Sequence, residues 1–502
     1  MRNLWVAAAL LATALVTHAS VIKHADLAQD PQDQITSVTE AIEQGVADLR
    51  DNNVEAASTA INNAIQSPVF AKLPQNEQYR ALLLAGMMAF DKRDYGQAHV
   101  LLKRATGIDQ TSQRAWYVRL ESAVNVQDYE DSARCITAIA QKWPDILHQI
   151  DPGVVFEIET YLRETNSKIE RDYLQALFDT DFDDHLGGTN ALWRDLALLW
   201  LREGNAQKAV LVSQRITSAR TKLSMLVDKR FDAITQKNTQ AYDIDRAVEK
   251  ELADDRAQVS AAPDQLKPLL TLQELLLGTH HYDEALAVAD KVIAKTADGK
   301  GSTTYKDFDE IYVWVLDARA RSLARLGRWD DAANQWEHAA RRPEHGEMNV
   351  SQIINLASFY ANLQRPKEAL DTLSELGNMS PYGRMQFEMV KLKVAIGQRD
   401  QAAISEHLAY MREHRADAIS TWQNALLLSG DLNAAGDLLV ERLANEKWRS
   451  DALVDMQNYA DVAMPPMAAE LERQSEKVIA EPKVQKALAK VGRIEHFNLD
   501  PP

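Results

Sequence analysis

One small residue, repeated at the same place in a helical pattern, constrains the fold of this 502-residue sequence more than any other feature. Apolar residues recur at three- and four-residue spacing, and Tyr79–Gln110 aligns with Gln113–Ile146 at an offset of 34 residues. Just after the turn of each window, the same position is small: Ala98, Ser132, Ala209, Ala285, Ala332, Ala369, Ala402 and Ala435. A small side chain lets two helices approach closely, and a hairpin of this size cannot bury its own apolar face. We therefore expect stacked helical hairpins.

The turns between the helices support this interpretation. Gly204, Gly327, Gly397 and Gly430 stand where the first helix of a window should end, and glycine tolerates the left-handed backbone of a helix C-terminus. No Val-, Ile- or Thr-rich segment alternates like a strand. The expected fold class is all-α.

The pattern resembles the tetratricopeptide repeat (TPR), whose signature is a Trp, a small residue, an aromatic, Ala, a bulky apolar residue and a closing Pro. The second window supplies Trp116, Tyr129 and Pro144 at such places. The resemblance implies a superhelix (an α-solenoid) in which the first helix of each hairpin lines a concave groove that binds a protein or peptide partner.

Irregular window spacing predicts two stacks separated by a degenerate helical pair. We expect an N-terminal array (20–222) opened by a capping hairpin (Thr36–Ile65), a spacer (223–263), a C-terminal array (264–464), and a cap helix with tail (465–502). A further hairpin is expected at Asp151–Phe178.

The first residues predict export. Arg2 precedes thirteen apolar residues and the small residues that follow, which is typical of a signal peptide (1–19) cleaved after Ala19. The run is short for a membrane anchor, and no later stretch is long and apolar enough to span a membrane. A periplasmic location is expected, with secretion as the alternative.

Composition and motifs argue against several functions. With 73 acidic against 56 basic residues, binding of nucleic acid through bulk charge is not expected. Cys135 is the single cysteine, so a multi-cysteine metal site is excluded, and it falls in an apolar helical stripe. A P-loop-like fragment (Gly299–Ser302) lacks the first Gly and the Ser/Thr after Lys, and an acidic run (Asp179–Asp184) lacks the Gly and Glu of a calcium loop. We expect no catalytic residue, cofactor or metal.

What remains is a binding surface. Positions that the resemblance places on the groove are rich in basic and aromatic residues: Arg80, Arg114, Tyr117, Arg194, Arg202, Trp314, Arg321, Arg325, Arg384, Phe387 and Lys391. A basic groove suits a carboxylate-rich partner because the Arg fork matches carboxylates. The predicted function is a non-enzymatic exported adaptor that binds a protein or peptide. The alternative is a helical carbohydrate-active or glycan-binding protein of the cell envelope.

Overall fold

The computed structural model describes residues 31–165, 167–183, 188–297, 299, 301–342, 349–374 and 376–501. The predicted signal peptide, Lys300 and Asp184 lie outside these residues. Every regular secondary-structure element among the described residues is a helix. The β structure there is limited to the isolated bridges Asp228–Gly492 and Asn458–His496. The prediction of an all-α, TPR-like array is confirmed. None of the described helices is long and apolar enough to cross a membrane. Packing divides the chain into two compact units, with the boundary after Asp128.

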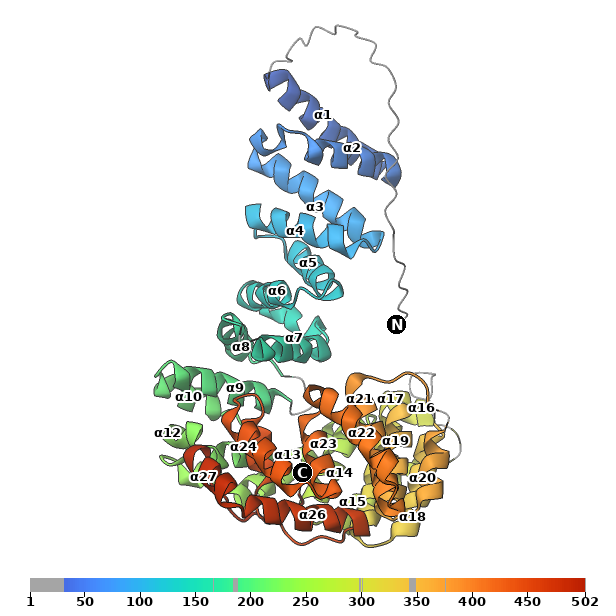
Figure 1. The fold of residues 1–502 in the computed structure, drawn as a ribbon. Helices are drawn as coiled ribbons and strands as arrows, with labels where there is room; N and C mark the ends of the chain where they lie inside the picture. The colour runs from blue at the N-terminus through green and yellow to red at the C-terminus, as the bar shows by residue number, and fades with distance from the viewer. Residues whose placement is uncertain are drawn as a thin grey trace, which may run out of the picture. The chain divides into compact units, whose positions relative to one another are not determined.

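Unit 1 is a stack of helices in chain order (Figure 1). Its helices are α1 (Pro31–Arg50), α2 (Val54–Gln66), α3 (Gln75–Asp91), α4 (Tyr95–Ile108) and α5 (Gln113–Asn125), with the 3₁₀ turn η1 (Phe70–Lys72) between α2 and α3. The expected N-terminal hairpin is present as α1–α2, whose core includes Ile42, Ala57 and Ile61, all fully buried.

Unit 2 begins with helices that precede the long C-terminal array. They are α6 (Tyr129–Lys142), α7 (Pro152–Glu164), α8 (Glu170–Asp179), α9 (Thr189–Arg202), α10 (Ala206–Ser213), α11 (Ala219–Val227), α12 (Asp232–Thr235) and α13 (Ile244–Ala261). Helices α7 and α8 form the additional hairpin expected at Asp151–Phe178. Short 3₁₀ turns intervene at η2 (Pro144–Gln149), η3 (Lys229–Phe231) and η4 (Thr239–Tyr242).

The remaining helices of unit 2 are mostly paired into hairpins. They are α14 (Lys267–Gly278), α15 (Tyr282–Thr296), α16 (Gly301–Thr304), α17 (Phe308–Arg325), α18 (Trp329–Ala340), α19 (Val350–Asn362), α20 (Pro366–Leu373), α21 (Pro381–Gln398), α22 (Gln401–Glu413), η5 (Arg415–Asp417), α23 (Ile419–Ser429), α24 (Leu432–Ala444), α25 (Arg449–Asp455), α26 (Pro466–Ile479) and α27 (Pro482–Val491).

Most of the hairpin turns share one backbone geometry. In nine of these turns, a residue with positive φ stands two positions before the first residue of the second helix: Asn52, Arg93, Gln127, Gly204, His280, Gly327, Gln364, Arg399 and Gly430. The next residue donates its N–H to a carbonyl five positions back, as Arg328 does to Leu323 at 2.9 Å and Asp400 to Ala395 at 3.0 Å. This Schellman pairing satisfies carbonyls that the helix end leaves free. The repeat is therefore visible in the backbone even where the sequence lacks glycine. The turn between α7 and α8 is the exception, since Lys168 has no positive φ.

The small residue predicted behind each turn is the fourth residue of the second helix, and it is fully buried in every window but one. Ala402 is the exception, because it is exposed. Helix α21 continues past Gly397, and Arg399 takes the left-handed conformation (φ 58°) instead of the glycine. The second helix therefore starts two residues later than we expected, and Ile404 occupies the fourth position. The assignments of Gly397 and Ala402 were wrong for this reason.

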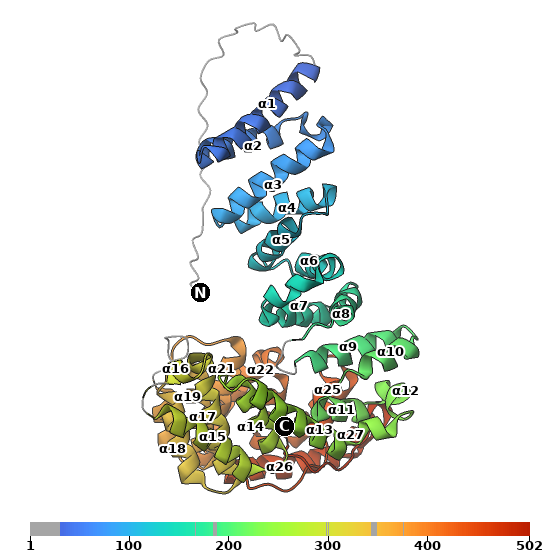
Figure 2. The ribbon, with the colours of Figure 1, turned by 180° about the vertical axis from the view of Figure 1, so that it is seen from behind.

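Within unit 2 the array closes on itself. Helix α11 packs against α13 on one side and against α25 on the other, and the helices between them follow one another in contact (Figure 2). Next to α25, the segment 492–501 runs back over α11: the N–H of Arg493 donates to Val227 O at 3.0 Å. A Cβ on Gly492 would lie 2.3 Å from Leu453 Cδ2 and 2.8 Å from Val227 O, so this crossing needs glycine.

Helix α26 packs across several helices of this closed array and runs along one edge of unit 2 (Figures 1 and 2). The predicted cap region consists of two helices, α26 and α27, with Pro482 at the start of the second. Helix α26 does not extend the stack, because it packs across α19, α23 and α24. Met467 and Val478 bury its apolar side in the core that includes residues of α23 and α24. Because α19 and α23 are first helices of their hairpins, α26 covers part of the face that was expected to form an open groove.

Candidate functional site

The groove residues predicted in unit 1 lie on α3 and α5. Arg80 is 3.9 Å from Glu77, and Arg114 is exposed. Tyr117 is half-buried beside Glu121, and burial followed by that negative charge raises the pKa of its hydroxyl. Binding of a partner by these residues stays a prediction.

In unit 2, three of the predicted residues form one cluster on α21. Phe387 is only 8% exposed, with Arg384 and Lys391 over its ring at 4.8 and 4.5 Å. Arg384 pairs with the buried Glu388 at 2.5 Å, and His407 Nδ1 lies 2.7 Å from the same carboxylate. Burial opposes ionisation of Glu388, but the His407 hydrogen bond and the Arg384 charge hold its pKa below the usual value. Phe387 is a core residue that leaves a partner little surface.

Arg321 and Arg325 of α17 face a cavity of about 580 Å³ shared with α14, α19 and the segment 492–501. Arg321 donates to Asp317 at 2.9 Å and to Glu274 at 3.2 Å. Arg325 donates to Asp500 Oδ2 at 2.6 Å. Both guanidinium groups thus line this cavity, and both are paired with carboxylates of this same chain.

The sequence did not indicate that Asp500 would lie in this cavity. It is 3% exposed, and Tyr282 donates a 2.6 Å hydrogen bond to its Oδ1. Its backbone is also held, since its N–H donates to Gly278 O at 3.0 Å and Arg220 donates to its carbonyl at 3.3 Å. Burial, and then the Asp500 carboxylate, raise the pKa of the Tyr282 hydroxyl.

The residues before Asp500 are held by backbone hydrogen bonds to residues 458–460. The Phe497 N–H donates to Asn458 O, and the Ala460 N–H donates to Leu499 O, at 2.9 and 3.2 Å. Phe497 and Leu499 are each 5% exposed. Phe497 and Leu499 thus anchor the segment in the apolar core of unit 2, and Asp500 and Pro501 that follow them line the cavity.

Trp314 lines a different cavity, of about 530 Å³, between α17, α19 and α21. All of its lining residues are uncharged: Trp314, Val350, Ser351, Ile354, Asn355, Ser358, Asn378, Met379, Ser380, Tyr382, Gly383 and Gln386. Tyr382 is 60% exposed. Trp314 and Arg325, both of which we predicted for the groove, thus belong to separate cavities.

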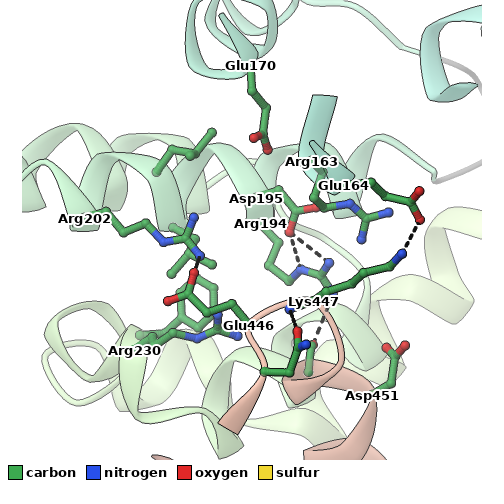
Figure 3. A pocket seen from close by; sticks show the side chains of 15 residues that line it. Arg163, Glu164, Glu170, Arg194, Asp195, Arg202, Arg230, Glu446, Lys447 and Asp451 are labelled. Atoms are coloured by element: carbon green, nitrogen blue, oxygen red, sulfur yellow. Dashed lines mark hydrogen bonds and ion pairs between the residues drawn. The ribbon is translucent and has the colours of Figure 1, made fainter. Parts of the chain in front are cut away.

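Arg194 and Arg202 of α9 line a third pocket, of about 270 Å³, between α7–α9 and residues 445–451 (Figure 3). Arg194 pairs with Asp195 at 2.9 Å, and Arg202 pairs with Glu446 at 2.5 Å. The Asp195 charge, against the effect of burial, raises the pKa of Arg194. The sequence did not indicate that Glu170 of α8 would enter this pocket.

No protein-family model matches this chain, and no curated protein matches it in sequence. Among solved structures it is similar to the APC/C hetero-tetramer Cut9–Hcn1 (15% identity, 93% of this chain and 99% of that chain, TM-score 0.28). It is also similar to yeast Tom70 (11%, 91% and 99%, TM-score 0.25) and to Naa15/Naa10 bound to HypK-THB (13%, 92% and 91%, TM-score 0.25). At these TM-scores, the fold assignment rests on the hairpins of the chain itself.

Proposed function

We propose that this protein is a non-enzymatic scaffold that binds an extended, acidic segment of a partner protein in the groove between α14, α17 and α26. The observation that supports the proposal is the seating of Asp500. Arg325 and Tyr282 hold its carboxylate, and Gly278 and Arg220 hold its backbone. A partner segment with the same spacing of apolar residues and carboxylate would find the same donors and acceptors.

Such a partner competes with the chain's own segment. A tethered segment has an effective concentration of the order of millimolar, so the groove is mostly occupied until a partner displaces the segment. The apparent affinity for the partner falls by the fraction of molecules whose groove is open.

A peptide experiment tests the proposal on the full chain. The probe is a labelled synthetic peptide with the sequence of residues 495–501, and the control peptide carries asparagine in place of its aspartate. The receptor is the variant Phe497→Ser/Leu499→Ser/Asp500→Lys, which removes both apolar anchors and repels Arg325. We expect it to bind the acidic peptide at least ~10-fold more tightly than wild type does.

The controls separate the groove from nonspecific binding. Adding Arg325→Gln to the receptor should abolish the preference for aspartate over asparagine, and circular dichroism should show that both receptors stay helical. Failure of the released receptor to bind the acidic peptide would mean that the groove serves only to bury the chain's own segment.

A second candidate function is supported by the cavity at Trp314. Its uncharged lining of amides, hydroxyls and two aromatic rings suits a neutral, hydroxyl-rich ligand such as a glycan chain. Titration with neutral oligosaccharides, compared between wild type and Tyr382→Ala, tests it, and unchanged binding in the variant would rule this site out.

Export is part of the same proposal. We propose cleavage after Ala19 and a periplasmic location, with secretion as the alternative, because of the apolar run behind Arg2. Intact-mass measurement of the protein from fractionated cells should give a chain that starts at Ser20.

A further inference from the structure

The pocket in Figure 3 is lined by charges of both signs, and its basic residues already have partners. Each is within 3.1 Å of a carboxylate: Arg163 with Glu159, Arg194 with Asp195, Arg202 with Glu446, Arg230 with Asp228, and Lys447 with Glu164. The positive charge of this pocket is therefore balanced within the chain.

Glu170 is different, because its carboxylate makes no hydrogen bond or ion pair with any part of the chain that the structure describes. The residue is 7% exposed, and its side chain points from α8 into the pocket (Figure 3). Burial, and then the nearby Asp195, raise its pKa to about 7. The opposing charges of Arg202 and Arg163, which are already paired with Glu446 and Glu159, are not close enough to offset this. Asp451, on the other side of the pocket, is exposed and likewise has no ion pair among the described residues. A buried carboxylate without a partner is costly, so the missing component is a positive charge.

The walls indicate what kind of cation fits. Leu198, Leu199 and Phe231 supply apolar surface next to the charged groups. Within the described residues, the carboxylates of this pocket do not gather into a group of three that could hold a metal ion. An anion would face Glu170 and would have to displace carboxylates from their arginines. An alkyl chain ending in a charged head satisfies both the apolar wall and the carboxylate.

We propose that this pocket binds an organic cation, an alkylguanidinium or alkylammonium group, whose head pairs with Glu170 and whose stem packs on Leu198, Leu199 and Phe231. The group is either a free small amine or the side chain of an arginine or lysine on another protein. This proposal is independent of the scaffold function, since it concerns different residues and a ligand of opposite charge.

Calorimetric titration of the full chain tests the proposal with three probes: agmatine, N-acetyl-arginine amide and butyrate. Agmatine should bind, and butyrate should not. Glu170→Gln, which keeps the shape and removes the charge, should weaken agmatine binding at least ~10-fold. Asp451→Asn should weaken it about twofold, because its carboxylate is exposed. Glu203→Gln, which alters an exposed carboxylate paired with Arg171, is the matched control and should change nothing.

The pH dependence gives a second readout. The Glu170 carboxylate must be ionised to pair with a cation, so wild-type binding should strengthen from pH 6 to pH 8. The charged groups that act on Glu170 are Asp195, Arg202, Arg163 and Glu159. Burial raises the pKa of Glu159 to about 7 as well. The Glu170→Gln variant should therefore lose most of the pH dependence, and Glu159 accounts for the rest.

The probes also distinguish the two sources of the cation. Agmatine that binds at least ~10-fold more tightly than N-acetyl-arginine amide identifies a free amine as the ligand, and equal affinities identify a side chain. Absence of agmatine binding, equal binding by wild type and Glu170→Gln, or tighter binding of butyrate would each overturn the proposal.

Discussion

Two regions of unit 2 differ in whether their charged side chains are paired with opposite charges of the chain. In the groove, Arg321 and Arg325 are matched by carboxylates of the chain itself, including Asp500 from a distant segment. In the pocket at α8, Glu170 makes no hydrogen bond or ion pair with any of the residues that the structure describes. A ligand of the groove must therefore displace something, whereas a ligand of the pocket supplies a missing charge. A partner that must displace the chain's own segment binds the groove with a lower apparent affinity. A cation that pairs with Glu170 stabilises the folded state.

Among the substitutions that test this comparison, that of Gly492 should change the stability most. In Gly492→Ala the new Cβ would meet Leu453 and the Val227 carbonyl, which should destabilise the packing of residues 493–500 by about 3 kcal/mol. Hydrogen–deuterium exchange should show loss of protection there and unchanged protection at α8. Gly397→Ala is the control, since its Cβ would meet nothing within 4 Å. Equal protection in both variants would mean that the crossing at Gly492 does not anchor the segment.

Glu170→Gln should have the next largest effect, and it should stabilise the protein. Because the pKa of Glu170 is raised from 4.5 to about 7, the folded state holds a proton that the unfolded state has lost, and stability falls as pH rises across that window. The neutral variant avoids this loss, so it should be more stable by about 2 kcal/mol at pH 8 and unchanged at pH 4. Urea unfolding at both pH values measures this. A variant less stable than wild type at pH 8 would show that the carboxylate already has a partner.

Asp500→Asn should have a smaller effect of the opposite sign. It weakens the contacts with Arg325 and Tyr282, but Arg325 is partly exposed and can turn toward water, so a loss of about 1.5 kcal/mol is expected. The matched control is Asp437→Asn, whose exposed ion pair with Lys483 should contribute less than about 0.5 kcal/mol. Equal changes in thermal midpoint for the two variants would contradict the special role of Asp500.

The smallest effect is expected at the exposed Ala402. Ala402→Leu should change stability by less than about 0.5 kcal/mol. Ala332→Leu, at the corresponding buried position of another hairpin, should destabilise by about 2 kcal/mol through overpacking. A large loss of stability in Ala402→Leu would show that Ala402 is buried, as the helix register predicted from the sequence requires.

The sequence predicted the hairpins because their signal is local. A small residue behind each turn and apolar spacing within each helix are visible in a window of one repeat, and the buried Ala98, Ala285 and Ala435 confirm it. The register at Arg399 could not be read in this way, because a glycine two residues earlier suggested an earlier helix end. Nothing in the amino-acid sequence around Arg399 indicates that an arginine, and not the glycine, takes the positive-φ position.

The candidate site depended on contacts between distant segments. Arg325 and Asp500 are 175 residues apart, so no repeat pattern relates them. The closure of the array, which brings residues 492–501 to α11 and α14, decides which carboxylate reaches which arginine. Glu170 was missed for the same reason, because its lack of a partner follows from how α8, α9 and residues 445–451 meet.

A crossed titration tests the central claim most directly. The two probes are agmatine and the acidic peptide of residues 495–501, and the two receptors are Glu170→Gln and the released variant Phe497→Ser/Leu499→Ser/Asp500→Lys. The account predicts that the released variant gains peptide binding and keeps agmatine binding, while Glu170→Gln loses agmatine binding and leaves peptide binding at the wild-type level. Loss of agmatine binding in the released variant would contradict the separation of the two sites. So would a change of peptide binding in Glu170→Gln.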